Sequence, residues 1–347
     1  MSNKLRVLSL FSGVGAFEQA LSNLNHPHEV INYCEINKFS SKAYSLLHDV
    51  DESLNLIDIT KINSSQLPDF DLLTHGSPCQ SFSVIGTQEG GDKGSGTKSS
   101  LMWYTVDIIK EKRPKYVIWE NVKNVLGKSH IHNFDAYIHE LDKLGYTSYH
   151  QVLNSLDYGS AQNRERLFVI SVLGEHAPFI FPKKQDRVHT IGEILESNVD
   201  EKYTVPHHCV IGYQNKKSIF RNRFTLKSPQ EHAFCLVAKG GRAVITNNYV
   251  FSDLNMYDNP PCKLNDLDYI ADNNIPIRAL TPKEYWRLQG FTDNQFSKVD
   301  GKISDNQLYT QAGNSITVSV IQAIFEQLFK KHDSVIEREI QLKWGEI

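Results

Sequence analysis

Cys79 is the side chain in this sequence whose setting best suits covalent chemistry. It stands in a polar turn, Gly-Ser-Pro-Cys-Gln, that directly follows an apolar run. Pro78 stiffens the backbone just before the thiol, and a cysteine in a polar, fixed turn is favoured as a nucleophile over a cysteine buried as a small apolar residue. A thiolate of this kind acts by forming a covalent bond to its substrate. We therefore predict that Cys79 is a catalytic nucleophile.

Three more residues could assist a nucleophile. Glu120 follows Trp119 at the end of another apolar run, and a carboxyl group beside an aromatic ring is partly desolvated and can hold a proton near neutral pH. Arg164 and Arg166 alternate along an extended segment, so they share one face and suit a carbonyl or a phosphate. A capping carboxylate and ordinary salt bridges are the alternatives. We predict that all three are catalytic.

A glycine-rich turn contains Gly13 and Gly15 and joins the first predicted strand to the first predicted helix. Glycines there let the backbone approach a ligand. Glu18 occupies the third glycine position of a dinucleotide fingerprint, so a smaller nucleoside cofactor fits better than a pyrophosphate. Glu35, 20 residues after Gly15, can accept hydrogen bonds from ribose hydroxyls. Asp58 follows the apolar pair Leu56-Ile57, where a further strand is expected to end at the same sheet edge, and it can accept a hydrogen bond from an adenine amino group. A plain tight turn with surface carboxylates is the alternative.

The elements that position these residues alternate between strands and helices. Apolar runs predict strands at 6–10, 30–34, 70–74, 116–119, 149–154 and 167–172, and amphipathic patterns predict helices at 17–24, 38–47, 101–112 and 134–144. This alternation predicts an α/β fold with a mostly parallel, doubly wound sheet covered on both faces. Ligands bind at the carboxyl edge of such sheets. The glycine-rich segment 80–100 is too long for an ordinary connection and is predicted to be a mobile active-site loop.

The alternation stops at about residue 182, where no helix period continues and Asn, Lys, Tyr and Gly rise. Helix signals return at Thr281-Pro282-Lys283-Glu284, a capping box with proline at the first helical position, and a last helix is predicted at 317–331. We predict a catalytic domain of residues 1–181 plus 277–332. A smaller, irregular β-rich domain spans 182–276, and a peripheral charged tail spans 333–347.

Charge is unevenly distributed. Between residues 202 and 242 there are eight basic residues and one acidic residue, a local charge of +7, although the chain as a whole carries −3. Such segregation suits a polyanion, with a solvated basic face as the alternative. The five cysteines are scattered, which argues against a disulfide framework or a structural zinc and for a reducing, cytoplasmic compartment. No apolar run reaches the ~18 residues of a membrane helix.

Taken together, six motifs resemble those of the DNA (cytosine-5) methyltransferase family, of the bacterial or phage restriction-modification type, in order and spacing. They are Phe11-x-Gly13-x-Gly15, Pro78-Cys79-Gln80, Glu120-Asn121-Val122, Gln162-x-Arg164-x-Arg166, Arg278-x-Leu280-Thr281-Pro282-x-Glu284 and Gln311-x-Gly313-Asn314-Ser315. The resemblance implies a Rossmann-like catalytic domain that uses S-adenosylmethionine, and it makes residues 182–276 the target-recognition domain.

The resemblance also implies binding roles. Phe17 would stack near the cofactor adenine and Ile36 on its other side, and Asn314 would lie near the methionine portion. The residues expected to bind the cofactor are Phe11, Gly13, Gly15, Phe17, Glu35, Ile36, Asp58, Ile59, Pro78, Leu101, Asn314 and Ser315. Those expected to bind DNA are Gln80, Ser83, Arg221, Arg223, Lys239 and Arg242.

The mechanism that the resemblance implies begins with a cytosine flipped out of the duplex. Cys79 adds to C6 while Glu120 hydrogen-bonds N3 and the amino group, and Arg166, with Arg164, holds the base carbonyl. C5 then takes the methyl group, and loss of the C5 proton releases the cysteine. Family members often carry a Thr-Leu pair in the target-recognition domain. Here that pair is Cys235-Leu236, with Thr225-Leu226 as a second candidate.

Three other functions would use part of these features. An RNA cytosine-5 methyltransferase could use the same motifs, although the Cys-Phe-Thr signature of the transfer-RNA branch is absent from the sequence. A catalytically silent DNA-binding module would not need Cys79, Glu120 and Arg166. A nicotinamide-dependent oxidoreductase would need a complete dinucleotide fingerprint. We expect duplex DNA as the substrate, a cognate restriction endonuclease as a partner, a monomer, and no membrane association.

Overall fold

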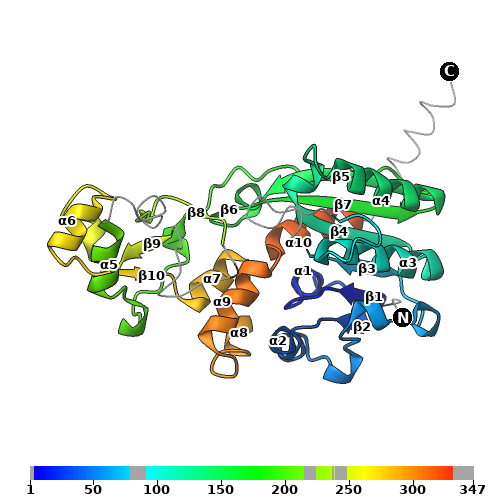
Figure 1. The fold of residues 1–347 in the computed structure, drawn as a ribbon, viewed down its shortest axis with the longest axis horizontal. Helices are drawn as coiled ribbons and strands as arrows, with labels where there is room; N and C mark the ends of the chain where they lie inside the picture. Colours follow the sequence, from blue (N-terminus) through cyan, green and yellow to red (C-terminus); the bar gives the residue numbers. More distant parts are fainter. Residues whose placement is uncertain (1–3, 79–90, 215–223, 237, 239–247, 331–347) are drawn as a thin grey trace, which may run out of the picture.

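A computed structural model describes residues 4–78, 91–214, 224–236, 238 and 248–330. Its centre is a six-stranded sheet in the order β2-β1-β3-β4-β7-β5 (Figure 1). The strands are β1 (Leu5–Leu10), β2 (His28–Cys34), β3 (Leu72–His75), β4 (Tyr116–Val122), β5 (Tyr146–Asn154) and β7 (Glu165–Leu173). Strands β2, β1, β3 and β4 are parallel, and β7 is antiparallel to both β4 and β5. The predicted mostly parallel sheet is confirmed.

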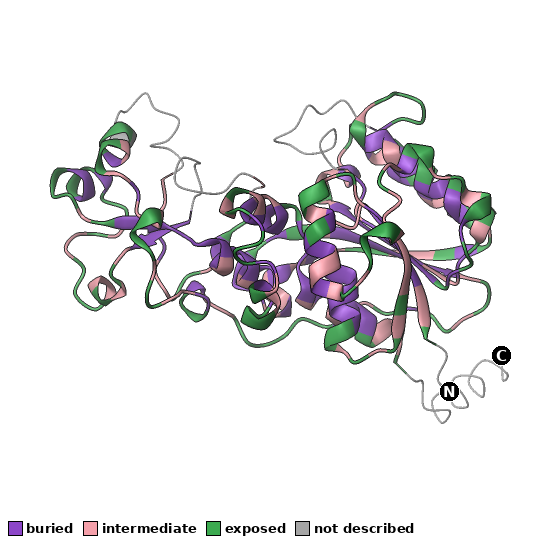
Figure 2. Cartoon of the chain, turned by 90° about the horizontal axis from the view of Figure 1, so that it is seen from below, coloured by how far each residue is buried: buried purple, intermediate pink, exposed green. Residues whose placement is uncertain are grey.

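Two layers of helices cover the sheet. They are α1 (Ala16–Asn23), α2 (Lys38–His48), α3 (Met102–Lys112), α4 (Ile131–Lys143) and α10 (Val318–Leu328). Alternate strand residues enter different cores: Val7 packs in the core that contains α1 and α10, whereas Leu8 packs in the core that contains α3 and α4. Figure 2 shows buried residues on the inner sides of these helices. Burial on both faces explains why the strands are almost continuously apolar.

The helices α7 (Pro282–Leu288), α8 (Asp293–Ser297) and α9 (Asp305–Asn314) lie beside the sheet, toward the left of Figure 1. The predicted capping box is confirmed: the Thr281 side chain accepts from Glu284 N at the start of α7, and the Glu284 side chain accepts from Thr281 N. The patterns predicted α7 and α10 but missed α8 and α9, which are short and mostly polar on their exposed sides.

The segment between the sheet and α7 forms a small lobe at the far end of the molecule (Figure 1). It contains α5 (His207–Gln214), α6 (Leu267–Asp272) and the antiparallel pair β9 (Tyr249–Phe251) and β10 (Ile277–Ala279). A separate apolar cluster holds these elements together. The sequence predicted no helix in this segment, which is wrong. The α5 sequence lacks an amphipathic pattern, and α6 spans only six residues.

One short parallel pair connects the two parts of the fold. β6 (Gln162–Asn163) pairs with β8 (Ala233–Phe234). In addition, the Gln162 side chain accepts a hydrogen bond from Leu236 N at 2.9 Å. The segment that follows β8 is therefore fixed against the start of β7. Within the described ranges, no helix is long and apolar enough to cross a membrane.

Candidate active site

The candidate residues meet at one edge because the parallel strands end in register. Leu10 lies beside both Cys34 and His75, and His75 lies beside Trp119. The residues that follow these positions are Phe11, Glu35, Gly76 and Glu120. The predicted convergence of the motifs at the carboxyl edge of the sheet is confirmed by this register. Such an edge is where ligands bind in α/β folds.

The glycine-rich turn has a conformation that explains its glycines. Gly15 is the N-cap of α1 with φ +79°, and a Cβ there would lie 2.2 Å from His48 Nε2. His48 is held in place by a 3.0 Å contact between its Nε2 and the carbonyl of Val14. Gly13 also has positive φ, but a Cβ there would meet nothing within 4 Å. One glycine is required by close packing, and the other leaves open space beside the backbone.

Glu35 lies across from this turn. Its Oε2 accepts a hydrogen bond from Gly13 N at 2.9 Å, and its Oε1 accepts one from Asn37 N at 2.7 Å. Burial raises the pKa of the Glu35 carboxyl, although these backbone donors oppose the shift. An ionised carboxylate has about four lone pairs, so it retains room for ligand hydroxyls. The neighbouring Ile36 side chain is apolar and 75% exposed.

Asp58 lies near the end of β2, but not at the end of a strand. The interpretation of residues 56–58 as a strand end is wrong, because Asn55 forms only a single bridge with Tyr33 and Asp58 caps a short 3-10 turn. Its Oδ1 accepts from Thr60 N at 3.0 Å and from Thr60 Oγ1 at 2.8 Å. These hydrogen bonds lower the pKa of Asp58. The half-buried carboxylate also pairs through Oδ2 with Lys61 Nζ at 3.5 Å, and its remaining lone pairs can accept further hydrogen bonds.

Apolar and carboxylate groups therefore line the same edge. This edge offers an apolar surface at Ile36, two acceptor carboxylates at Glu35 and Asp58, and open backbone at Gly13. Together these groups fit a nucleoside. Phe11, Pro78 and Leu101 are half-buried around this edge, and Asn314 is exposed at the end of α9. Four predicted cofactor residues are buried: Gly15, Ile59, Ser315 and Phe17, which is 4% exposed and packs on Phe325. Their contact with a cofactor stays a prediction.

The turn that leads into the predicted nucleophile is tightly held. Ser77 Oγ accepts a hydrogen bond from Trp119 Nε1 at 3.0 Å, and the Ser77 carbonyl accepts one from Asn121 Nδ2 at 3.1 Å. All three residues are buried. Cys79 is two residues further along the chain and, like Gln80 and Ser83, lies outside the described residues. The sequence marked Asn121 only as a member of the Glu120-Asn121-Val122 motif. Its hydrogen bond to the Ser77 turn was not predicted.

Glu120 is 8% exposed and faces Arg166. The distance between Glu120 Oε1 and Arg166 Nε is 3.2 Å. Val122 lies opposite Arg166 in the β4–β7 register, which brings the arginine beside the carboxyl end of β4. Burial raises the pKa of the Glu120 carboxyl, and the charges of Arg166 and Arg164 only partly oppose this shift. Glu120 therefore holds its proton more firmly than an ordinary glutamate.

Arg164 is 4% exposed and binds backbone carbonyls. Its Nη2 donates to the carbonyl of Ser315 at 2.8 Å and to that of Gly313 at 3.2 Å, and its Nη1 donates to that of Leu236 at 3.4 Å. These contacts join three separate segments of the chain. Arg164 thus fits a positioning role better than direct contact with a substrate, and Ser315 takes part through its backbone.

The predicted shared face of the two arginines agrees with their contacts. Arg164 Nη1 lies 3.4 Å from Cys235 Sγ, and Arg166 Nη2 lies 3.9 Å from the same sulfur. The sequence marked Cys235 only as a departure from a Thr-Leu pair, because no pattern announces a contact between residues about 70 positions apart. The predicted DNA-binding residues Arg221, Arg223, Lys239 and Arg242 lie outside the described residues.

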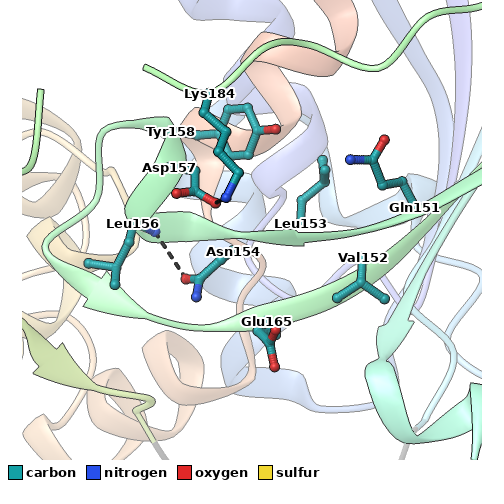
Figure 3. A pocket seen from close by; sticks show the side chains of 9 residues that line it. All are labelled: Gln151, Val152, Leu153, Asn154, Leu156, Asp157, Tyr158, Glu165 and Lys184. Carbon is teal, nitrogen blue, oxygen red and sulfur yellow. Dashed lines mark hydrogen bonds and ion pairs between the residues drawn. The ribbon is translucent and has the colours of Figure 1, made fainter. Parts of the chain in front are cut away.

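A cavity of about 240 Å³ lies beside β5 (Figure 3). It contains an ion pair between Lys184 and Asp157 at 2.9 Å, and Leu156 N donates to Asn154 Oδ1 at 3.2 Å on its wall. Glu165 lines it, whereas Arg166, the next residue on the strand, does not. The cavity is therefore separate from the cluster around Glu120. In the described part of the chain, no group of three His, Cys, Asp or Glu side chains could hold a metal ion.

The comparisons with known proteins agree with this geometry. The model of the family described as C-5 cytosine-specific DNA methylase matches residues 5–330. The type II methyltransferase M2.ScrFI of Lactococcus lactis subsp. cremoris is 32% identical, over 94% of this chain and 99% of that protein. The type II methyltransferase M.SsoII of Shigella sonnei is also 32% identical, over 96% of this chain and 82% of that protein.

Solved structures agree on the fold. The Dnmt2 methyltransferase of S. pombe superposes with a TM-score of 0.75 at 20% identity and covers 94% of this chain and 99% of that one. The methyltransferase EhMeth of Entamoeba histolytica gives a TM-score of 0.76 at 22% identity, over 94% and 98%. The predicted α/β methyltransferase fold and the family resemblance are confirmed. The chain belongs to the C-5 cytosine-specific DNA methylase family, whose members are S-adenosylmethionine-dependent DNA methyltransferases.

Proposed function

We propose that this enzyme methylates C5 of a cytosine flipped out of a short duplex target, through a covalent adduct with Cys79. The observation that supports the proposal most directly is the pair formed by the buried Glu120 and the half-buried Arg166. It stands at the same sheet edge as the fixed Ser77 turn that leads into Cys79. This arrangement brings a proton-holding carboxyl and a guanidinium beside the expected position of the nucleophile.

Each group has a distinct task in this proposal. The Cys79 thiolate bonds to C6 of the ring, and the neutral Glu120 carboxyl donates its hydrogen bond to N3, so electron density moves toward C5. Arg166 is a fixed donor for the base carbonyl and stabilises charge that develops on the ring. After methylation a base takes the C5 proton, the freed electron pair restores the C5–C6 double bond, and the C6–S bond breaks to release the Cys79 thiolate. Arg164 holds the surrounding backbone.

The sheet edge beside β2 is the proposed cofactor site. Glu35 would accept from the ribose hydroxyls, Ile36 would pack on the adenine, and Asp58 would accept from its amino group. The open backbone at Gly13 leaves room for close approach. S-adenosylmethionine, when bound, supplies an electrophilic methyl group. Asn314, exposed at the end of α9, would face the methionine portion.

Residues 182–276 are the proposed target-recognition domain. Its basic residues would hold phosphates and read base edges, and flipping the base costs a few kcal/mol. The named relatives include type II methyltransferases and, for Bacillus phage SPbeta, an orphan methyltransferase. We therefore propose a restriction-modification context with a cognate endonuclease in a bacterial or phage-infected cell, and a monomer in its cytoplasm.

The decisive experiment uses purified protein, methyl-labelled S-adenosylmethionine and mixed-sequence duplex DNA. We expect label at one recurring short sequence, mapped as 5-methylcytosine at base resolution. Cys79→Ser should abolish transfer yet bind the cofactor as wild type does. Transfer to RNA but not to duplex DNA would move the substrate assignment to RNA. Near-wild-type turnover by Cys79→Ser would reject the covalent mechanism.

A further inference from the structure

A thiol that the proposed chemistry does not use stands beside both arginines. Cys235 comes directly after β8, and its sulfur contacts Arg164 Nη1 at 3.4 Å and Arg166 Nη2 at 3.9 Å. Arg166 contacts Glu120 through Nε at 3.2 Å and donates from Nη1 to the Glu165 carbonyl at 2.7 Å. The guanidinium group of Arg166 therefore contacts both the Cys235 sulfur and the Glu120 carboxyl that the proposed mechanism needs.

The contact also ties two parts of the fold together. Leu236, the next residue, accepts a hydrogen bond from Arg164 Nη1 through its carbonyl, and its backbone N–H donates to the Gln162 side chain. Residues 233–236 are thus anchored to the start of β7 at several points. Cys235 is the member of this segment whose side chain reaches the arginine pair.

The Cys235 sulfur can offset the positive charges of Arg164 and Arg166. Two guanidinium groups face the cluster, and in the proposed mechanism Glu120 keeps its proton and offsets neither. A buried charge without a counter-charge is costly. Cys235 is exposed as a residue, yet desolvation of its sulfur opposes ionisation, and the charges of Arg164 and Arg166 outweigh this effect and lower the pKa of the thiol. The sulfur therefore accepts from both guanidinium groups and offsets part of their charge while the carboxyl keeps its proton.

We propose that Cys235 is a positioning residue that aligns Arg166 with Glu120 and couples residues 233–236 to the methyl-transfer site. This inference rests on the proposed function of Glu120 and Arg166. Arg164 and Arg166 are the charged groups of the described residues that face the sulfur. Because Cys235 offsets part of the arginine charge, its loss should draw the proton off Glu120 at a lower pH.

Steady-state kinetics test the coupling. Since hydrogen bonds to charged groups contribute about 1.5–3 kcal/mol, Cys235→Ala should lower kcat by about tenfold or more and shift the alkaline limb of activity to lower pH. Cys235→Ser should lose less, because a hydroxyl still accepts from the arginines. The KM for S-adenosylmethionine should not change. Cys262→Ser, in the small lobe, is the matched control, and equal kcat and pH profiles for Cys235→Ala and this control would overturn the proposal.

Thiol labelling tests the contact without requiring methylation. A Cys79→Ser protein is treated with iodoacetamide across a pH series, and each cysteine peptide is quantified by mass spectrometry. Cys235 should become reactive at lower pH than Cys262, whose pKa is raised by burial and by Asp266. Adding Arg166→Met should move Cys235 reactivity to higher pH.

The two readouts separate the possible failures. If the protein methylates no DNA but Cys235 responds to Arg166→Met as expected, the proposed function fails and the contact stands. If Cys235 reacts at the same pH as Cys262 in both proteins, the positioning role is overturned even when methylation is normal. Thermal unfolding of Cys235→Ala and Cys262→Ser at matched pH excludes a difference caused by misfolding.

Discussion

Arg278 and Glu284 form a buried, two-pronged ion pair: Arg278 Nη1 lies 2.8 Å from Glu284 Oε2, and Arg278 Nη2 lies 2.8 Å from Glu284 Oε1. Arg278 belongs to β10 in the small lobe, and Glu284 belongs to the first turn of α7. The same carboxylate accepts the backbone N–H of Thr281 at 2.7 Å. The pair therefore fixes the angle at which the chain returns from the small lobe to the catalytic part.

Breaking this pair should destabilise the protein strongly. Glu284→Gln or Arg278→Met leaves one charged partner buried, and removal of one partner of a buried pair costs about 3–5 kcal/mol. Chemical unfolding should show a loss of this size. Asp293→Asn breaks a more exposed pair with Arg287 and should cost at most about 1 kcal/mol. Equal losses for both pairs would contradict the structural role of the buried pair.

The sheet and its edge could be predicted from sequence because their signals are local. Apolar runs located the strands, and their carboxyl ends placed Glu35 and Glu120 at one edge. The arginine contacts could not be predicted in this way. Arg164 reaches carbonyls at 236, 313 and 315, which come together only after the small lobe and α9 have packed. Cys235 stands beside it for the same reason.

The helices of the small lobe were missed for a different reason. The α5 sequence has no apolar stripe, and α6 is too short for a period to show. Tertiary packing, not local preference, stabilises short helices of this kind. The same limit applied to Asp58, whose two preceding apolar residues suggested a strand although only one bridge forms there.

Gly15→Ala should damage the cofactor turn severely. The residue has φ +79°, and an added Cβ would lie 2.2 Å from His48 Nε2 and 2.9 Å from Tyr44. Gly174→Ala is the matched control, since it also has positive φ but nothing within 4 Å of its Cβ. Gly174→Ala should lower the free energy of unfolding only by the backbone strain, about 1–2 kcal/mol. Calorimetric titration with S-adenosylmethionine should show that Gly15→Ala loses affinity and the control retains it.

Glu120 should impose an alkaline limit on activity. Because burial raises its pKa, the carboxyl remains protonated to higher pH than usual, and the hydrogen bond to N3 is lost as pH rises through the raised value. Glu120→Ala should lower kcat by about 10²–10⁴-fold, the usual contribution of a positioned acid. Glu120→Gln should lose less and should lack this alkaline limb, since an amide does not titrate. An unchanged limb in kcat/KM for Glu120→Gln would assign the limit to another group.

Glu18 should make the stability of the fold decrease with rising pH. It lies in the first turn of α1 with 0% exposure, and burial raises the pKa of its carboxyl, although Ser9 and Tyr44 oppose the shift. The folded protein therefore binds this proton more tightly than the unfolded chain. Its contribution to stability is fully present below the unfolded pKa, near 4.5, and decreases as pH rises toward the folded pKa. Glu18→Gln removes the titration, so the melting temperatures of wild type and variant should converge at about pH 4–5 and diverge above it, with the variant melting higher. Parallel melting curves from pH 5 to 8 would show that Glu18 titrates alike in both states.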